Sequence, residues 1–301
     1  MNFMCCAFIS NDNYDNILLN KISMPTGRTD WRKIMYIISA VVEKNQSKVA
    51  LFDKEYKFLA KKEGAVADVA GLCSEIITEA GINASDVAYA GVAADEILSG
   101  LEEKLGVRVL GTTLINAKAL GEAYELNDAD TLVIVKIDET VECGIIMDKK
   151  AYTGAHNQSA KLAHMVIGFG GYECTCGRRG CFEAYASISG LNRIAAESGV
   201  AGAGELTHAQ LFAMDTPEAK SAQKLYVEYL ASGITNIVNL FQPRHLVLDG
   251  AFTKVGDALM TPVIDIILRD QYTHSNPNKC EIRFANTEAD TALLGAALLG
   301  R

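Results

Sequence analysis

The pattern of hydrophobic and polar positions along this chain predicts a mixed α/β protein. Three apolar runs rich in β-branched residues come first, separated by short charged turns as in an antiparallel meander; they cover residues 34–42, 48–53 and 57–62. Apolar positions with helical spacing follow over residues 64–80. A strand, a helix and a strand are then predicted at 87–92, 97–105 and 107–110. These elements form a first half of the fold.

The second half of the chain repeats this order of elements. A helix is predicted at 117–125, followed by strands at 131–137, 143–147 and 151–153. Residues 184–241 are mostly helical, with a break rich in glycine and alanine at 199–204. The last predicted elements are a strand at 246–248, a helix at 256–267, a strand at 281–284 and a helix at 291–299. Two similar halves with a cleft between them are therefore expected.

Residues 1–35 fit neither half. They are rich in asparagine and aspartate and contain the turn Pro25-Thr26-Gly27, so we expect an irregular N-terminal extension. The predicted organisation is this extension, a first lobe over residues 36–115 with 288–301, and a second lobe over residues 116–287.

Composition and charge narrow the classes of function. The 301 residues are 49% hydrophobic and 22% charged, as in ordinary globular proteins. The formal net charge of −9 argues against direct nucleic-acid binding, because an acidic surface repels phosphate polyanions. The apolar runs are too short to span a membrane, and the apolar opening lacks the basic region of a signal peptide. We expect a cytoplasmic protein without a membrane or nucleic-acid partner.

A cluster of cysteines predicts a metal centre. Three of the eight cysteines lie within eight residues, and one histidine lies a short loop upstream; the predicted ligands are His164, Cys174, Cys176 and Cys181. Three thiolates and one imidazole match a closed, structural zinc site. Gly177 and Gly180 would let the loop turn back on itself, and Arg178 and Arg179 would offset the thiolate charge. The alternative is a loop of three free thiols.

The same segment carries a family resemblance. The sequence CTCGRRGCFEAYAS at 174–187 resembles the Cys-x-Cys-Gly-x-x-Gly-Cys-x-Glu signature of the ROK family of sugar kinases and repressors. Segments similar to other family elements follow the same order, at 119–124, 230–252 and 290–300. The resemblance runs from about residue 36 to residue 301. It implies an actin-like ATPase (ribonuclease H-like) fold, with two lobes around a central cleft, and a homodimer.

The resemblance also implies that the residues for phosphoryl transfer are missing. The family's two phosphate-binding turns correspond to residues 41–45 and 138–142, which contain no glycine. Val41 replaces the aspartate that helps to hold magnesium, and Leu114 replaces the catalytic base, so no catalytic residue is assigned. Carboxylates stand in both turns where an anion should bind, namely Glu43, Asp138, Glu139 and Glu142.

On the sugar side only part of the family pattern is retained. Asn116 and Glu183 remain as candidate substrate contacts, and Gly250 remains of the glycines on the adenosine side. Glu183 has a second interpretation, as a structural carboxylate beside the cysteine loop. Lys161 replaces a glutamate that contacts sugar, and the loop after Gly91 is shorter than in the family.

Together these losses favour a catalytically degenerate protein with structural zinc, acting as a regulatory or binding protein without ATP or Mg²⁺. Its cleft is left open as a site for a small carbohydrate or an anionic ligand. One alternative is a glucokinase-like enzyme that phosphorylates a hexose or N-acetylhexosamine, with Asp95 or Asp138 as substitute base. Another is a ROK transcriptional regulator without its DNA-binding domain, because residues 1–35 are too short for a winged helix-turn-helix.

Overall fold

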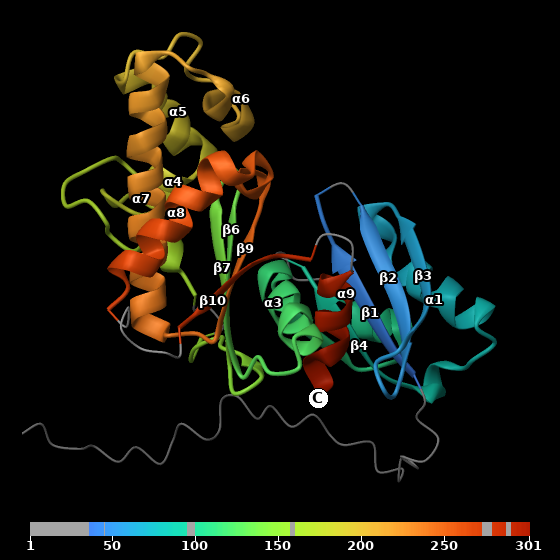
Figure 1. The fold of residues 1–301 in the computed structure, drawn as a ribbon. Helices are drawn as coiled ribbons and strands as arrows, with labels where there is room; N and C mark the ends of the chain where they lie inside the picture. The colour runs from blue at the N-terminus through green and yellow to red at the C-terminus, as the bar shows by residue number, and fades with distance from the viewer. Residues whose placement is uncertain (1–35, 45, 95–99, 157–159, 273–278, 287–289) are drawn as a thin grey trace, which may run out of the picture.

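The protein is built around two five-stranded sheets that lie side by side (Figure 1). The computed structural model describes residues 36–44, 46–94, 100–156, 160–272, 279–286 and 290–301. Each sheet has helices on its outer face, and helices α3 (Leu114–Glu125) and α9 (Thr291–Ala297) lie between the sheets. The expected α/β architecture of two lobes is confirmed.

The first sheet has the strand order β3-β2-β1-β4-β5, in which β1 pairs antiparallel with β2 and parallel with β4. Its strands are β1 (Tyr36–Val42), β2 (Ser47–Asp53), β3 (Phe58–Gly64), β4 (Val87–Ala93) and β5 (Val109–Thr112). Two α-helices accompany them, α1 (Val69–Glu79) and α2 (Leu101–Leu105), with short 3₁₀ turns at Val66–Asp68 and Ala84–Asp86. The apolar face of α1 packs against β2 and β3, which explains its helical spacing of buried residues.

The second sheet repeats this topology with the order β10-β9-β6-β7-β8. Its strands are β6 (Thr131–Ile137), β7 (Val141–Met147), β8 (Lys150–Ala151), β9 (His245–Asp249) and β10 (Glu281–Phe284). The helices are α4 (Glu183–Ala186), α5 (Ile188–Glu197), α6 (His208–Ala213), α7 (Pro217–Phe241) and α8 (Asp257–Asp270), with 3₁₀ turns η4 (Leu162–His164) and η5 (Ala251–Val255). The last 3₁₀ turn, η6 (Leu298–Gly300), follows α9 and packs against β4 and β5 of the first sheet. The largest apolar core fills the space between this sheet and these helices.

Helices α3 and α9 join the two lobes because glycines let their backbones meet. A Cβ on Gly121 would lie 1.9 Å from the carbonyl oxygen of Thr291, and one on Gly295 would lie 1.7 Å from that of Ala117. Helix α9 also packs against β1, and α3 packs against β7. The small side chains therefore bring both sheets onto one tightly packed helix pair.

The structure differs from the sequence-based expectations mainly at element ends. Helix α3 begins at Leu114 rather than at residue 117, because the Thr113 hydroxyl accepts the Asn116 N–H and caps the first turn. The helix expected at 97–105 is described only over Leu101–Leu105. Residues 1–35 lie outside the described part of the chain, and the lobe boundaries stay predictions. Within the described ranges, no helix has the length and apolarity needed to cross a membrane.

Candidate metal centre and interlobe cleft

The structure brings the four predicted metal ligands together. His164 ends η4, Cys174 and Cys176 lie in the loop that follows, and Cys181 immediately precedes the turn into α4. Their ligand atoms all lie within 4.8 Å of one another. The Cys174 sulfur is 3.6 Å from His164 Nδ1, and the Cys176 sulfur is 3.7 Å from the Cys181 sulfur.

These separations match a tetrahedral zinc site. Zn–S bonds of about 2.3 Å and Zn–N bonds of about 2.0 Å give ligand-to-ligand edges of roughly 3.5–3.8 Å in a tetrahedron. The Cys174–His164 and Cys176–Cys181 separations, 3.6 Å and 3.7 Å, both fall in that range. The donor set of three thiols and one imidazole leaves no open position, so it fits a structural role rather than a catalytic one.

Glycines and backbone hydrogen bonds fold the cysteine loop. Gly177 and Gly180 both have left-handed φ angles, 83° and 81°. The N–H of Cys174 donates to the Arg178 carbonyl at 2.9 Å and closes the turn. A Cβ on Gly180 would lie 1.7 Å from the Gly168 carbonyl oxygen, so only glycine permits this close approach.

The surroundings shift the pKa values of Cys176 and Cys181 in opposite directions. A backbone hydrogen bond from Arg178, with the charge of its guanidinium, lowers the pKa of Cys176 below its ordinary value. Burial raises the pKa of Cys181 to about 12. Arg179 instead lies 4.0 Å from Glu173, so only one of the two predicted arginines acts on a thiolate. A metal ion would supply the charge that the buried thiolate needs.

Glu183 is engaged inside the protein. Its carboxylate is buried and accepts hydrogen bonds from the Thr175 hydroxyl and from the Val141 N–H, each at 3.1 Å. One oxygen also lies 3.7 Å from the Cys174 sulfur. Of the two interpretations made from sequence, this geometry favours the structural carboxylate beside the cysteine loop.

Asn116 and Gly250, the other candidate contacts, lie near the cleft in different surroundings. Asn116 is in the first turn of α3, and its Oδ1 atom is buried without a hydrogen-bond partner among the described residues. Gly250 has φ 110°, and a Cβ there would lie 2.3 Å from the carbonyl oxygen of Ile137. The fold itself therefore requires glycine at 250, whether or not a nucleotide binds.

The cleft between the lobes is a cavity of about 270 Å³ whose wall includes Leu114 and Ile115. Each of the three lysines that line it pairs with a carboxylate of the chain: Lys48 with Glu43 (3.8 Å), Lys118 with Asp249 (2.7 Å) and Lys136 with Glu142 (3.4 Å). Burial opposes the charge of Lys136, but Glu142 and Asp138 hold its pKa above the ordinary value. The cleft cations are therefore already neutralised.

The turn between β6 and β7 is closed by its own hydrogen bonds. The Asp138 N–H donates to the Thr140 carbonyl at 3.1 Å. One Asp138 oxygen accepts the Ala251 N–H at 2.7 Å, and the other lies 3.6 Å from Lys136. Backbone N–H groups at this edge of the cleft therefore point at a carboxylate of the chain. Lys161 is exposed and is not among the residues that line the cavity.

The sequence analysis did not single out Lys118 and Lys136. Lys136 stands in the β-branched run TLVIVKI, where a charged residue in an otherwise apolar strand could have indicated a partner. Lys118 lies among small apolar residues of α3, and only the tertiary structure brings it to Asp249, which is 131 positions away.

Comparisons with known proteins agree with the resemblance seen in the sequence. The sequence profile described as the ROK family matches residues 45–301. A xylose repressor of Bacillus subtilis is 31% identical over 157 residues, which cover 51% of this chain and 40% of the repressor. A glucokinase of Halalkalibacterium halodurans is 30% identical over 181 residues, covering 54% of each protein. The chain thus spans about half the length of these relatives.

Solved structures share the fold at low sequence identity. A ROK hexokinase from Thermus thermophilus superposes with a TM-score of 0.76 at 22% identity, over 88% of this chain and 97% of that one. A ROK glucokinase from Streptomyces griseus, in complex with glucose and AMPPNP, gives a TM-score of 0.62 at 19% identity, over 87% of this chain and 98% of that one. The expected actin-like fold is confirmed by these likenesses.

Proposed function

This chain belongs to the ROK family, and on that premise we propose that it is a catalytically degenerate member that holds one structural zinc ion and acts by binding, as a regulatory protein, without phosphoryl transfer. The observation that carries the proposal is the cleft, where the chain's own carboxylates take the places that an anionic ligand would need. A homodimer of the 32.4 kDa chain is part of the proposal.

Electrostatics support the absence of ATP chemistry. Two like unit charges 4 Å apart repel by about 1 kcal/mol in water and by about 4 kcal/mol at an effective dielectric constant of 20. A nucleotide phosphate would meet Glu43 and Glu142 in the cavity wall, while Lys118 is held by Asp249. Leu114 stands at the position of the catalytic base and cannot accept a proton. The loss of a positioned base lowers the reaction rate roughly 10²–10⁴-fold.

The zinc part of the proposal rests on the donor set and its geometry. His164, Cys174, Cys176 and Cys181 would hold the ion, which would neutralise thiolate charge and close the loop on α4. The purified protein should contain one zinc per chain by elemental analysis. The variant C181S should lose the metal, and C280S, which changes a cysteine outside the cluster, should retain it. Metal-free wild-type protein would contradict this part.

The absence of kinase activity is tested by direct measurement. We expect no sugar-dependent formation of ADP with a panel of hexoses and N-acetylhexosamines, under conditions in which a ROK glucokinase turns over. A thermal-shift titration with ATP and Mg²⁺ should leave the melting temperature unchanged, since stabilisation requires binding to the native state. Saturable stabilisation by the nucleotide, or turnover with any sugar, would overturn the proposal.

The alternative of a working kinase draws its support from the glucokinase among the relatives. It needs a substitute base. Asp95 lies outside the described residues, and the Asp138 carboxylate is held by Ala251 and Lys136. Because one Asp138 oxygen is already engaged by the Ala251 N–H and Leu114 stands at the family's base position, we favour the binding protein. The alternative of a transcriptional regulator draws on the repressor relative. Tight binding of duplex DNA in a low-salt gel shift would show direct DNA binding and would favour this alternative.

A further inference from the structure

A second cavity, of about 660 Å³, lies at the other end of α3 from the cleft. The two cavities share no lining residue: the cleft uses Leu114, Ile115 and Lys118, whereas this one uses Leu120, Ala123 and Tyr124. Strand β5 of the first sheet lines one side, and β8 of the second sheet lines another. The cavity is therefore walled by both lobes, with the C-terminal turn η6 beside them.

The inner wall of the cavity is apolar and preformed. Its lining includes buried side chains from three elements, namely Leu120 (8% exposed), Ala129 (2%) and Leu298 (6%). A volume between about 300 and 1,000 Å³ with an apolar lining is typical of sites for small organic molecules.

The rim of the cavity is cationic, although the chain as a whole carries a net charge of −9. Three cations line it, Lys149, Lys150 and Arg301, against the carboxylate of Asp148; Lys149 pairs with Asp130 at 3.3 Å, which leaves Lys150 and Arg301 to face an anion. The Arg301 guanidinium lies 5.1 Å from the centre of the Tyr124 ring, which fixes its position. Lys150 is exposed and forms no ion pair among the described residues. An anion at the rim would meet free positive charge.

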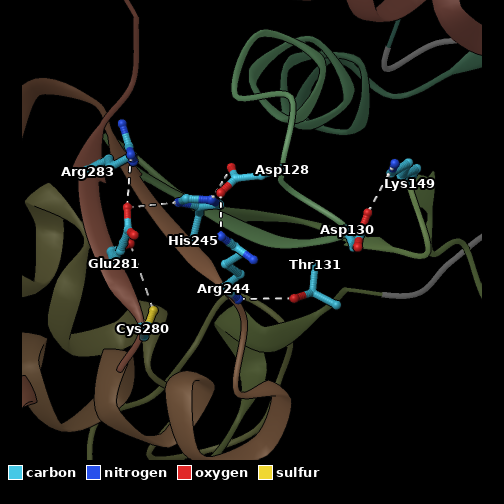
Figure 2. Close-up of polar contacts among 9 residues, drawn as sticks. All are labelled: Asp128, Asp130, Thr131, Lys149, Arg244, His245, Cys280, Glu281 and Arg283. Atoms are coloured by element: carbon cyan, nitrogen blue, oxygen red, sulfur yellow. Dashed lines mark hydrogen bonds and ion pairs between the residues drawn. The ribbon is translucent and has the colours of Figure 1, made fainter. Parts of the chain in front are cut away.

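The turn that forms one wall, residues 127–131, makes polar contacts with its neighbours (Figure 2). Asp128 pairs with Arg244 at 2.6 Å and with the fully buried His245 at 3.0 Å, and Asp130 pairs with Lys149 at 3.3 Å. The backbone of Arg244 also donates to the Thr131 hydroxyl at 3.0 Å. The contacts of Asp128 and Thr131 tie the wall to the start of β9, and the pair of Asp130 ties it to the turn between β7 and β8.

We propose that this cavity binds a small organic anion, with its apolar body against Leu120 and Leu298 and its acidic group at Lys150 and Arg301. A cation would be repelled by the rim, and a fully polar ion would leave the apolar wall uncovered. The proposal does not depend on the state of the cleft. Because the wall belongs to both lobes, occupancy would favour one arrangement of the lobes.

The test uses the full chain and the fluorescent aryl sulfonate 1-anilinonaphthalene-8-sulfonate, with the neutral N-phenyl-1-naphthylamine as its uncharged partner. The filling variant is G111F. Gly111 lines the cavity, no atom lies within 4 Å of a Cβ added there, and its φ lies outside the left-handed region, so the ring can enter the cavity without backbone strain.

We expect saturable binding of one sulfonate per chain and at least tenfold weaker binding of both dyes by G111F. Circular dichroism and the melting temperature verify that G111F is folded. Unchanged dye affinity in folded G111F, or no saturable binding by the wild type, would overturn the proposal.

A charge variant tests the acidic group and also serves if G111F does not fold. K150E should bind the sulfonate several-fold more weakly and the neutral dye as well as the wild type does. The matched control is K104E, which makes the same charge change on α2, outside the cavity lining. If K150E and K104E bind the sulfonate equally well, the cavity does not recognise an anion.

Discussion

The carboxylate of Glu183 accepts the backbone N–H of Val141 at 3.1 Å and so joins the cysteine loop to the turn between β6 and β7. The two residues are 42 positions apart in the chain. Since the other carboxylate oxygen accepts from Thr175 in the cysteine loop, one side chain links the candidate metal centre to the edge of the cleft.

Replacing Glu183 with glutamine should therefore weaken both ends of this link. We expect E183Q to hold zinc about tenfold less tightly in competition with a chelator, because outer partners of a metal loop orient its ligands. Unfolding should be easier by about 1–2 kcal/mol, since hydrogen bonds to a charged carboxylate become weaker bonds to a neutral amide. E173Q, in the same loop but exposed, is the control. Zinc affinity equal to that of the wild type would show that Glu183 does not support the loop.

The pair of Lys118 and Asp249 should behave as a buried ion pair. Asp249 is 7% exposed, so K118M would remove the hydrogen-bonded partner of a buried carboxylate and cost about 3 kcal/mol in denaturant unfolding. The double variant K118M/D249N should recover part of that loss. E43Q, which removes the longer pair with Lys48, should change stability by less than about 0.5 kcal/mol. If the loss of stability in K118M/D249N equals the sum of the losses in K118M and D249N, the two residues are not coupled.

The raised pKa of Glu122 predicts that the protein becomes less stable towards alkaline pH. Burial raises the pKa of this carboxyl from 4.5 to about 7, against a hydrogen bond from the Asn286 N–H that lowers it. Between these values the native state binds more protons than the unfolded state, so the free energy of unfolding falls as pH rises through about 7.

The variant E122Q cannot ionise and should remove this decline. At pH 8 it should be more stable than the wild type by on the order of 2 kcal/mol, with little difference near pH 4.5. The exposed neighbour Glu125 supplies the control E125Q, whose pH profile should follow that of the wild type. A wild-type slope that persists in E122Q would assign the decline to another group.

The lowered pKa of His208 predicts a loss of stability in acid. Burial lowers its pKa from 6.5 to about 4, although Asp138 acts in the opposite direction. The Tyr226 hydroxyl donates to the Ala186 carbonyl at 2.7 Å, so its oxygen accepts the Nε2 proton of neutral His208 at 2.8 Å. Because the native pKa is the lower one, stability is complete above pH 6.5 and is lost as pH falls through about 4.

The variant H208F should flatten this acid limb of the stability curve. At pH 7 it should cost about 1 kcal/mol for the lost hydrogen bond. The exposed His156 gives the control H156Q, which should keep the wild-type acid limb. Between about pH 4.5 and 6.5, Glu122 and His208 change the free energy of unfolding with pH in opposite directions. Urea unfolding of E122Q and H208F separates the two contributions.

Much of the candidate site could be predicted from local spacing. Three cysteines within eight residues can reach one metal ion because Gly177 and Gly180 permit the intervening turns, and the structure brings His164 to them as expected. The start of α3 was predicted three residues late, because the capping signal of Thr113, whose hydroxyl accepts the Asn116 N–H, was not used.

The sequence by itself determined which elements form and which four side chains could hold a metal ion, because periodicity and short spacings act within a few residues. The absence of glycine from the two cleft turns became visible through the resemblance to the ROK family. Only the tertiary structure decided the partners of Lys118, the engagement of Glu183 and the cavity behind α3. These depend on contacts between residues far apart in the chain, such as the glycine-mediated approach of α3 to α9, and sequence spacing does not encode the distance between such residues.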